Sequence, residues 1–136
     1  MLTLFGIACF GQAAPGDCLS YEPTVVNLRG TLIRSTLPGP ANYQDVRRGD
    51  TAETSWFLEL DSSICVNVDN SQPDLNPSQA DIRKVQLVLQ ASMYKRYRAL
   101  LGRKVVARGT LFGAHTGHHH TPVLLTVKSL QLAQGK

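Results

Sequence analysis

The sequence predicts a mainly β protein, a small Greek-key barrel of five or six strands with one short helix before the closing hairpin. Short runs of alternating apolar and polar residues recur along the chain, loops rich in Pro and Gly separate them, and only the segment before the last two runs has helical spacing. The chain has 136 residues, of which 43% are hydrophobic and 18% are charged. We therefore expect one folded domain with a core rather than a disordered chain.

The first fourteen residues, MLTLFGIACFGQAA, carry no charged side chain. Their apolar run is too short to cross a bilayer but suits a signal peptide, and Gly11-Gln12-Ala13 supplies the small residues that a signal peptidase reads. The usual Lys or Arg at the start is missing, which leaves a longer leader or an apolar N-terminal strand as alternatives, and Gly6-Ile7-Ala8-Cys9 also resembles a lipobox. We expect a signal peptide at 1–14, a single domain at 15–136 and a periplasmic or secreted protein.

Removal of the leader takes Cys9 with it and leaves two cysteines, Cys18 and Cys65. An even count in an oxidising compartment predicts one disulfide, which would stabilise the domain by about 3–4 kcal/mol. In the cytosol the same pair would instead be buried thiols. No cysteine spacing in the chain matches a redox or zinc motif.

The first strand is predicted at 24–36, where Val26, Leu28, Gly30 and Leu32 share one face. A glycine inside a strand often marks a bulge or a tight bend. The segment 37–53 is rich in Pro, Gly and polar residues and is longer than most connections, which is typical of a functional or mobile loop.

Two alternating runs at 54–60 and 64–68 flank the polar triplet Asp61-Ser62-Ser63, and this pattern predicts a β-hairpin. A loop at 69–81 and a strand at 84–90 follow. The segment 93–101 is predicted to be a short helix, capped by Ser92, stopped by Gly102, and packed through Tyr94, Tyr97 and Leu101. One continuous helix over 81–101 is the alternative.

The last two strands are predicted at 103–112 and 121–132, and the alternation of the second slips near 128–130. The tetrapeptide Arg-Gly-Thr-Leu occurs twice, at 29–32 and 108–111. Either the repeat is a coincidence, or both glycines relieve crowding where strongly curved strands coil round a barrel.

The pattern Tyr97-x-x-Leu100-x-Gly102-x-Lys104-Val105-x-x-x-Gly109-x-Leu111, followed by a loop and the segment 123–132, resembles the helix and closing hairpin of an oligonucleotide/oligosaccharide-binding (OB) fold. The stretch 85–132, with Thr116-Gly117-His118-His119-His120-Thr121-Pro122-Val123, also resembles DUF4431, a domain of bacterial secreted proteins. This resemblance covers roughly the C-terminal third of the chain and implies a fold and a compartment, but no activity.

Charge is distributed unevenly along the chain. All ten acidic residues lie between Asp17 and Asp81, whereas ten Lys and Arg and no acidic residue follow Asp81, for a net charge of +4. Either the basic part binds an anionic partner, or acidic and basic strands neutralise each other; we favour the second because the first and fourth strands of such a barrel are neighbours. Nucleic acid is not expected as a partner, since Tyr94 and Tyr97 are assigned to the core.

All four histidines lie within six residues, at 115, 118, 119 and 120. Imidazole binds Zn²⁺ and Cu²⁺, and in an extended segment His118 and His120 share a side that His115 could reach. No carboxylate lies within this segment to orient the rings or to act as a base. A solvated polar turn and a pH-responsive loop are the alternatives.

We expect a non-enzymatic exported binding module for an anionic or sugar-like ligand, because the chain has no nucleophile-elbow motif and no phosphate-binding glycine loop. In an OB barrel the loop after the first strand and the loop between the fourth and fifth border the binding face. One alternative is a metal-binding protein that holds Zn²⁺ or Cu²⁺ through His115, His118 and His120, and another is a structural or interaction protein of the cell envelope. We expect a monomer without a transmembrane segment in the mature chain. The residues expected at the ligand are Tyr43, Arg47, Arg48, Arg29, Arg108 and His119.

Overall fold

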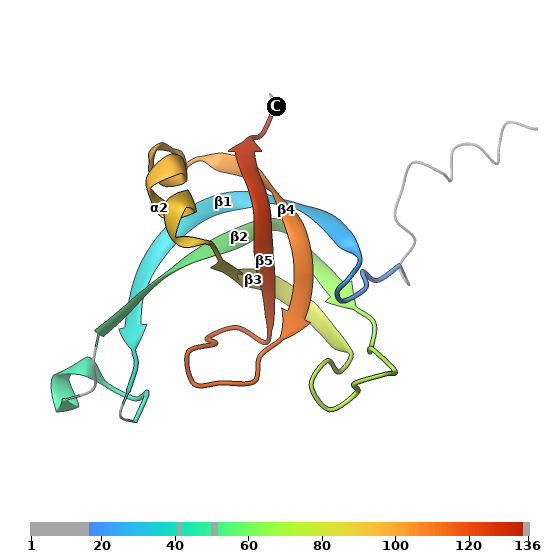
Figure 1. Ribbon diagram of the computed structural model, residues 1–136, viewed down its shortest axis with the longest axis horizontal. Helices are drawn as coiled ribbons and strands as arrows, with labels where there is room; N and C mark the ends of the chain where they lie inside the picture. The colour runs from blue at the N-terminus through green and yellow to red at the C-terminus, as the bar shows by residue number, and fades with distance from the viewer. Residues whose placement is uncertain (1–16, 41, 50–51, 135–136) are drawn as a thin grey trace, which may run out of the picture.

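Five strands close into a barrel in the order β1-β2-β3-β5-β4, with β4 paired back to β1 (Figure 1). The computed structural model describes residues 17–40, 42–49 and 52–134, so the predicted signal peptide at 1–14 lies outside the described residues. Every strand pair is antiparallel except β3 with β5, which is parallel. The strands are β1 (Val25–Pro38), β2 (Ala52–Val66), β3 (Gln79–Val88), β4 (Lys104–Gly113) and β5 (Val123–Leu132).

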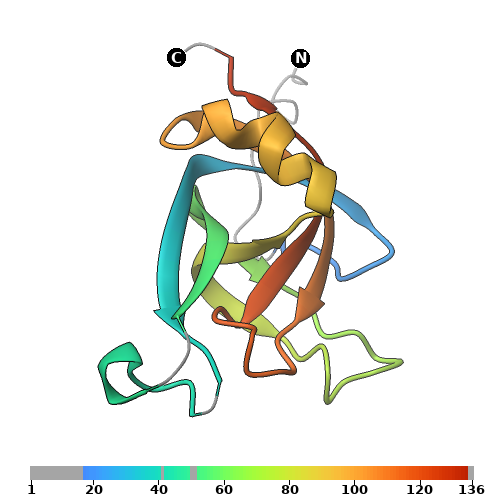
Figure 2. The ribbon, with the colours of Figure 1, turned by 60° about the vertical axis from the view of Figure 1, so that its left-hand side comes forward.

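A short helix, α2 (Ala91–Tyr97), and a 3₁₀ turn, η2 (Arg98–Leu100), lie between β3 and β4. Another 3₁₀ turn, η1 (Val46–Arg48), lies in the loop between β1 and β2. Helix α2 covers one end of the barrel, and the β1–β2 and β4–β5 loops extend from the opposite end (Figures 1 and 2). The strand order and the position of the helix are those of an OB fold, so the predicted fold class is confirmed.

Alternate residues of the strands fill the barrel, as the period-two pattern predicts. The aliphatic side chains of Leu32, Leu58, Val85 and Val105 are fully buried in one cluster. At the end covered by α2, Met93 of the helix joins this cluster. The interior is therefore a packed core rather than a cavity.

The two glycines of the repeated tetrapeptide lie where a neighbouring strand comes too close for a side chain. A Cβ atom on Gly30 would lie 2.2 Å from the carbonyl oxygen of Glu59, and one on Gly109 would lie 2.0 Å from that of Thr126. At Gly30, strand β1 pairs with both β2 and β4. The repeat therefore has a structural cause, which is the crowding of curved strands.

The hairpin predicted around Asp61-Ser62-Ser63 is wrong, because residues 52–66 form the single strand β2. The register shows how the triplet is accommodated: Glu59 pairs with Lys84 and Ile64 with Ile82, so five steps along β2 match two along β3. The polar triplet is a bulge in a continuous strand rather than a turn, and a bulge produces the same interruption of the alternation.

The helix is confirmed, but its predicted N-cap is wrong. The capping position is Gln90, which makes no side-chain capping bond, and Ser92 already lies inside the helix. The alternative of one helix from 81 to 101 is also wrong, because β3 extends to Val88. Tyr97 and Leu101 pack against the core as predicted, whereas Tyr94 remains 37% exposed and leans edge-on against Trp56.

Other boundaries agree closely with the sequence. Gly102 ends the helical segment with a φ of +84°, a conformation that glycine adopts without strain. The slip predicted near 128–130 is a register shift, in which Arg108 pairs with Ser129 but Gly109 pairs with Val127. The loop predicted at 69–81 ends earlier, because β3 begins at Gln79.

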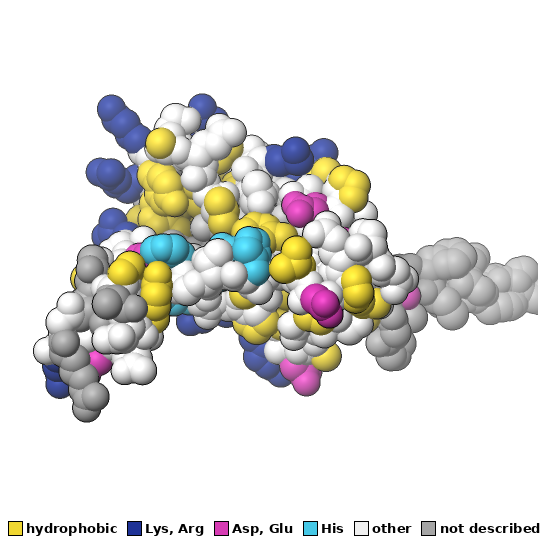
Figure 3. Space-filling model, turned by 60° about the horizontal axis from the view of Figure 1, so that its bottom comes forward, with side chains coloured by type: hydrophobic (Ala, Val, Ile, Leu, Met, Phe, Trp, Pro, Cys, Tyr) yellow, Lys and Arg dark blue, Asp and Glu magenta, His cyan; other side chains and the backbone are white. Residues whose placement is uncertain are grey.

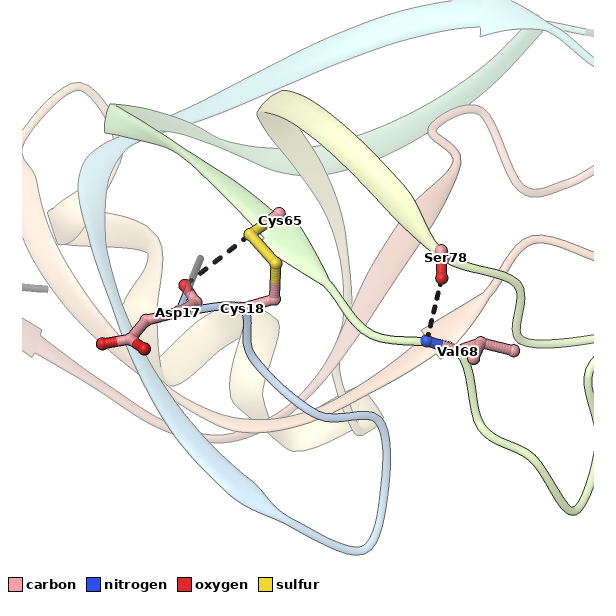
Figure 4. Close-up of a disulfide and its surroundings, with 5 residues drawn as sticks. All are labelled: Asp17, Cys18, Cys65, Val68 and Ser78. Atoms are coloured by element: carbon pink, nitrogen blue, oxygen red, sulfur yellow. Dashed lines mark hydrogen bonds between the residues drawn. A yellow bond between two sulfur atoms is a disulfide. The ribbon is translucent and has the colours of Figure 1, made fainter. Parts of the chain in front are cut away.

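Cys18 and Cys65 form the predicted disulfide, with their Cα atoms 4.7 Å apart (Figure 4). Leu19 pairs with Val66, so the N-terminal segment lies as an extra bridge beside the end of β2. Further along, Tyr21 is buried and donates a hydrogen bond of 2.6 Å to the carbonyl of Pro77. The disulfide thus fastens the N-terminal segment to the sheet, although Cys65 lies near the end of β2 rather than in a hairpin.

Within the described residues, no helical segment has the length and apolar composition needed to cross a membrane.

Candidate functional site

The β4–β5 loop, residues 114–122 and here called the histidine loop, is held against the outer side of β3 by Gln86. The side-chain amide of Gln86 donates to the carbonyl of His118 (3.0 Å), and its oxygen accepts from the backbone N–H of His120 (2.6 Å). The backbone N–H of Gln86 donates to the hydroxyl of Thr121 (2.9 Å). Gln86 is 7% exposed, so these bonds are shielded from water and fix the loop backbone. Figure 3, which looks toward the loop end of the barrel, shows histidine side chains at the surface there.

A carboxylate joins the two imidazoles that the alternation places on one side. Glu53 accepts a hydrogen bond from Nδ1 of His118 at one oxygen and from Nε2 of His120, 2.9 Å away, at the other. His120 is nearly buried, with 14% of its side chain exposed, whereas the side chain of His118 is 57% exposed. The site therefore combines a fixed ring, an accessible ring and a carboxylate.

Sequence reasoning missed Glu53 because it searched for a carboxylate within the loop. Glu53 stands at the start of β2, 65 residues before His118 in the chain. The alternation of β2 contained a usable signal, since Glu53, Ser55 and Phe57 share one face and Phe57 pairs with Gln86. Only the strand order, however, places that face beneath the histidine loop.

The two imidazoles change the acidity of Glu53. Burial alone would raise the pKa of its carboxyl group, but the hydrogen bonds from His120 and His118, together with the charges of these rings, hold the pKa below its ordinary value. Glu53 is therefore ionised at neutral pH and can act as the anionic partner of both rings.

His115 does not join this group and lies against His119, with ring centroids 4.7 Å apart. The backbone N–H of His115 donates to Nδ1 of His119 (3.0 Å), and both rings lie on Phe112. The reason is a turn in which the N–H of His119 donates to the carbonyl of Thr116, so the loop is folded rather than extended. Burial, followed by the charges of the other three histidines, lowers the pKa of His119.

The β1–β2 loop meets the histidine loop through Tyr43. The ring of Tyr43 lies edge-on to His118 with centroids 5.6 Å apart, and a Cβ atom on Gly117 would lie 2.6 Å from that ring. Arg47 lies in η1, and its side chain is exposed. Its backbone N–H donates a hydrogen bond to the carboxylate of Asp45. The side chain of Arg48 lies outside the described residues. The structure thus brings the two loops together, as the OB resemblance implies.

Arg29 and Arg108 are exposed on the adjacent strands β1 and β4, but they do not reach the histidine loop. Arg29 pairs with Asp61 (3.5 Å) and donates to the carbonyl of Gln134 (2.9 Å). Asp61 also pairs with Lys104, at the start of β4, whereas the histidine loop follows the end of β4. These contacts show an acidic residue of β2 neutralising basic residues of β1 and β4.

Two surface hollows lie away from this cluster. Both occur beside β1. The first has a volume of about 390 Å³ and is lined by Glu22, Pro23, Val25, Thr110 and Lys128. The second has a volume of about 260 Å³ and is lined by Leu19, Asn27, Leu28, Arg29, Leu60, Asp61, Ser62 and Ile64. Over the ranges that the structure describes, no three His, Cys, Asp or Glu side chains are placed to hold a metal ion.

Fold and site together define a small OB-type barrel with an ordered histidine loop. A family model described as Domain of unknown function (DUF4431) matches residues 84–131, which confirms the resemblance seen in the sequence. The match contains α2 and the histidine loop but neither Glu53 nor Tyr43. No curated protein and no solved structure shows a significant match to the chain.

Proposed function

We propose that this protein is a non-enzymatic binding module that acts in the periplasm or outside the cell and holds a sugar-like ligand over the two loops. The observation that carries the proposal is the meeting of Tyr43, Glu53 and His118, which come from the β1–β2 loop, β2 and the histidine loop. In OB barrels these two loops flank the ligand. The disulfide supports an oxidising compartment.

The chemistry of this surface favours a neutral polyhydroxylated ligand over an anion. An aromatic ring that is 37% exposed, at Tyr43, can pack against the apolar face of a sugar ring, and an accessible imidazole, at His118, can exchange hydrogen bonds with hydroxyl groups. The ionised Glu53 would repel an anion at the same place. Arg29 and Arg108, which the sequence analysis placed at an anionic or sugar-like ligand, lie elsewhere on the barrel.

The proposal includes no catalytic step, and the hydrogen bonds within the site serve to hold its side chains and the loop backbone in place. Both oxygens of Glu53 accept hydrogen bonds from imidazoles, and Gln86 holds the loop backbone on each side of His119. A binding surface needs this kind of rigid support, since ordering a mobile loop on binding would reduce the affinity.

Divalent-metal binding is a second candidate function. The observation that favours it is that Glu53 adds a carboxylate to His118 and His120, whose donor atoms are of the types that Zn²⁺ or Cu²⁺ prefers, although the three described side chains are not spaced to hold an ion as they stand. The three side chains hydrogen-bond one another directly, so a metal ion would have to displace the two protons they share. This cost makes sugar binding the better-supported function.

A glycan array followed by calorimetry with each positive glycan tests the proposal. The chain offers a matched pair of tyrosines, because Tyr43 and Tyr94 are each 37% exposed but lie at opposite ends of the barrel. We expect Tyr43→Ala to weaken glycan binding by about tenfold or more and Tyr94→Ala to leave it unchanged. An array without a positive glycan, or equal losses in the two variants, would contradict the proposal. Zn²⁺ binding that is tight in the wild type and lost in Glu53→Gln would favour the metal alternative.

A further inference from the structure

The segment of α2, η2 and the following turn carries four basic side chains that the site described above does not use, and we call it the basic ridge. None of the four takes part in an ion pair with another described residue, whereas the neighbouring Lys104 is paired with Asp61. No acidic residue follows Asp81 in the sequence. All four side chains are exposed: Lys95, Arg96, Arg98 and Arg103.

The ridge is held rigidly on the barrel. Met93 is buried in the core, and Leu100 and Leu101 pack against it. The backbone continues this anchoring, because the N–H of Gly102 donates to the carbonyl of Leu32 (2.7 Å) and the N–H of Leu32 donates to the carbonyl of Arg103 (3.0 Å). The charges therefore project from a fixed support, and binding does not have to order the backbone that carries them.

The shape of the ridge distinguishes between anionic partners. Helix α2 lies across the end of the barrel as a convex element (Figure 2). A nucleic acid chain is usually held in a groove with aromatic rings free to stack on its bases. Here Tyr97 packs against the core and Arg96 lies over its ring at 5.8 Å, so this ring is not free. A convex row of cations beside one exposed tyrosine, Tyr94, suits a flat anionic surface instead.

We propose that the basic ridge docks onto the anionic surface of a phospholipid membrane. Each Lys or Arg near such a surface increases partitioning by about fivefold, so four exposed cations are sufficient for reversible attachment. In this orientation the histidine loop and the β1–β2 loop, at the opposite end of the barrel, face away from the membrane. The inference does not depend on the ligand of those loops.

Co-sedimentation of the full chain with lipid vesicles tests this proposal. We expect binding to vesicles that contain about 30% phosphatidylglycerol, no binding to phosphatidylcholine alone, and loss of binding as salt increases from about 0.1 M to 0.5 M. Lys95→Glu with Arg98→Glu should reduce partitioning by about 25-fold or more. The matched control, Arg108→Glu with Lys128→Glu, makes the same change in net charge on β4 and β5 and should bind nearly as well as the wild type. If the first variant does not fold, Lys95→Gln with Arg98→Gln replaces it.

Fluorescence locates the contact, because Trp56 is the only tryptophan and its ring lies 5.2 Å from that of Tyr94. We expect its emission to change when anionic vesicles are added. Four results would overturn the proposal: equal binding to neutral vesicles, equal losses in the two charge-reversed variants, co-sedimentation without a change in Trp56 emission, or tighter binding to a single-stranded oligonucleotide than to the anionic vesicles.

Discussion

The two ends of strand β2 are fastened to distant parts of the chain by different chemistry. Near its end, Cys65 is bonded to Cys18, and backbone hydrogen bonds join Leu19 to Cys65 (2.8 Å) and to Asn67 (2.9 Å). Near its start, the carboxylate of Glu53 holds two imidazoles of the histidine loop. The first attachment is covalent, whereas the second depends on the ionised carboxylate of Glu53, whose pKa its hydrogen-bond partners hold below the ordinary value. The protein therefore combines a permanent attachment at one end of β2 with an attachment at the other end that depends on protonation.

Removal of the covalent attachment should have the largest effect. The bridge joins residues 47 apart in the sequence, and the chain-entropy model gives a stabilisation of about 4 kcal/mol for a loop of that length. Cys18→Ser with Cys65→Ser should lower the free energy of unfolding by this amount in urea titration. Reduction of the wild type should reproduce the effect, and a loss below about 1 kcal/mol would show that the N-terminal segment is held mainly by its hydrogen bonds.

Alanine substitutions at two glycines, one in the barrel and one in the histidine loop, compare the rigidity of these two parts. In Gly109→Ala the new methyl group meets a backbone carbonyl at 2.0 Å, so a strand must shift, and we expect a loss of about 2–3 kcal/mol in unfolding free energy. In Gly117→Ala it meets the ring of Tyr43, the end of a flexible and partly exposed side chain, and the loss should remain below about 1 kcal/mol. Urea titration of both variants measures the difference, and equal losses would mean that the loops are as rigid as the barrel.

The barrel could be predicted because its signals are local. Alternation identified all five strands, and the glycines at 30 and 109 marked the crowded positions of β1 and β4. The bulge at Asp61-Ser62-Ser63 was misread, since a short polar interruption has the same appearance whether the chain turns or bulges. The helix start was missed by two residues because Gln90, which lacks a capping bond, leaves no mark in the sequence.

The site was only partly predictable, for a different reason. His118 and His120 meet on one side of their loop, which alternation predicts. His115 was misplaced because the turn at Thr116 folds the loop back, and Gly117 within that turn was the available signal. Glu53 was missed because its contact depends on strand order over 65 residues, information that local patterns do not contain.

Glu53→Gln should weaken the titratable attachment. The substitution replaces hydrogen bonds to a carboxylate by bonds to a neutral amide, and we expect a loss of about 1–2 kcal/mol in unfolding free energy at neutral pH. The pKa of Glu53 is lowered in the folded protein, so its contribution is complete above the ordinary value of 4.5 and disappears as the pH falls through the folded value. The stability difference between wild type and variant should therefore shrink on acidification below about pH 4.5. Glu59→Gln is the control, because Glu59 lies on the same face of β2 but is exposed, and it should show a smaller loss. A difference that stays constant with pH would show that charge is not what holds the loop.

His119→Asn should produce the smallest effect, and it tests whether His119 adds to the pH response. The pKa of His119 is lowered by burial and by the charges of its neighbours, so the folded protein binds this proton less readily than the unfolded chain does. Its contribution to stability is therefore complete above the ordinary value of 6.5 and declines as the pH falls from there to the folded value. Asparagine keeps an acceptor for the N–H of His115 but does not titrate. In urea titrations across this range, the variant should lose less stability than the wild type, by under about 1 kcal/mol. Parallel profiles would leave Glu53 as the source of the pH dependence at this end of the barrel.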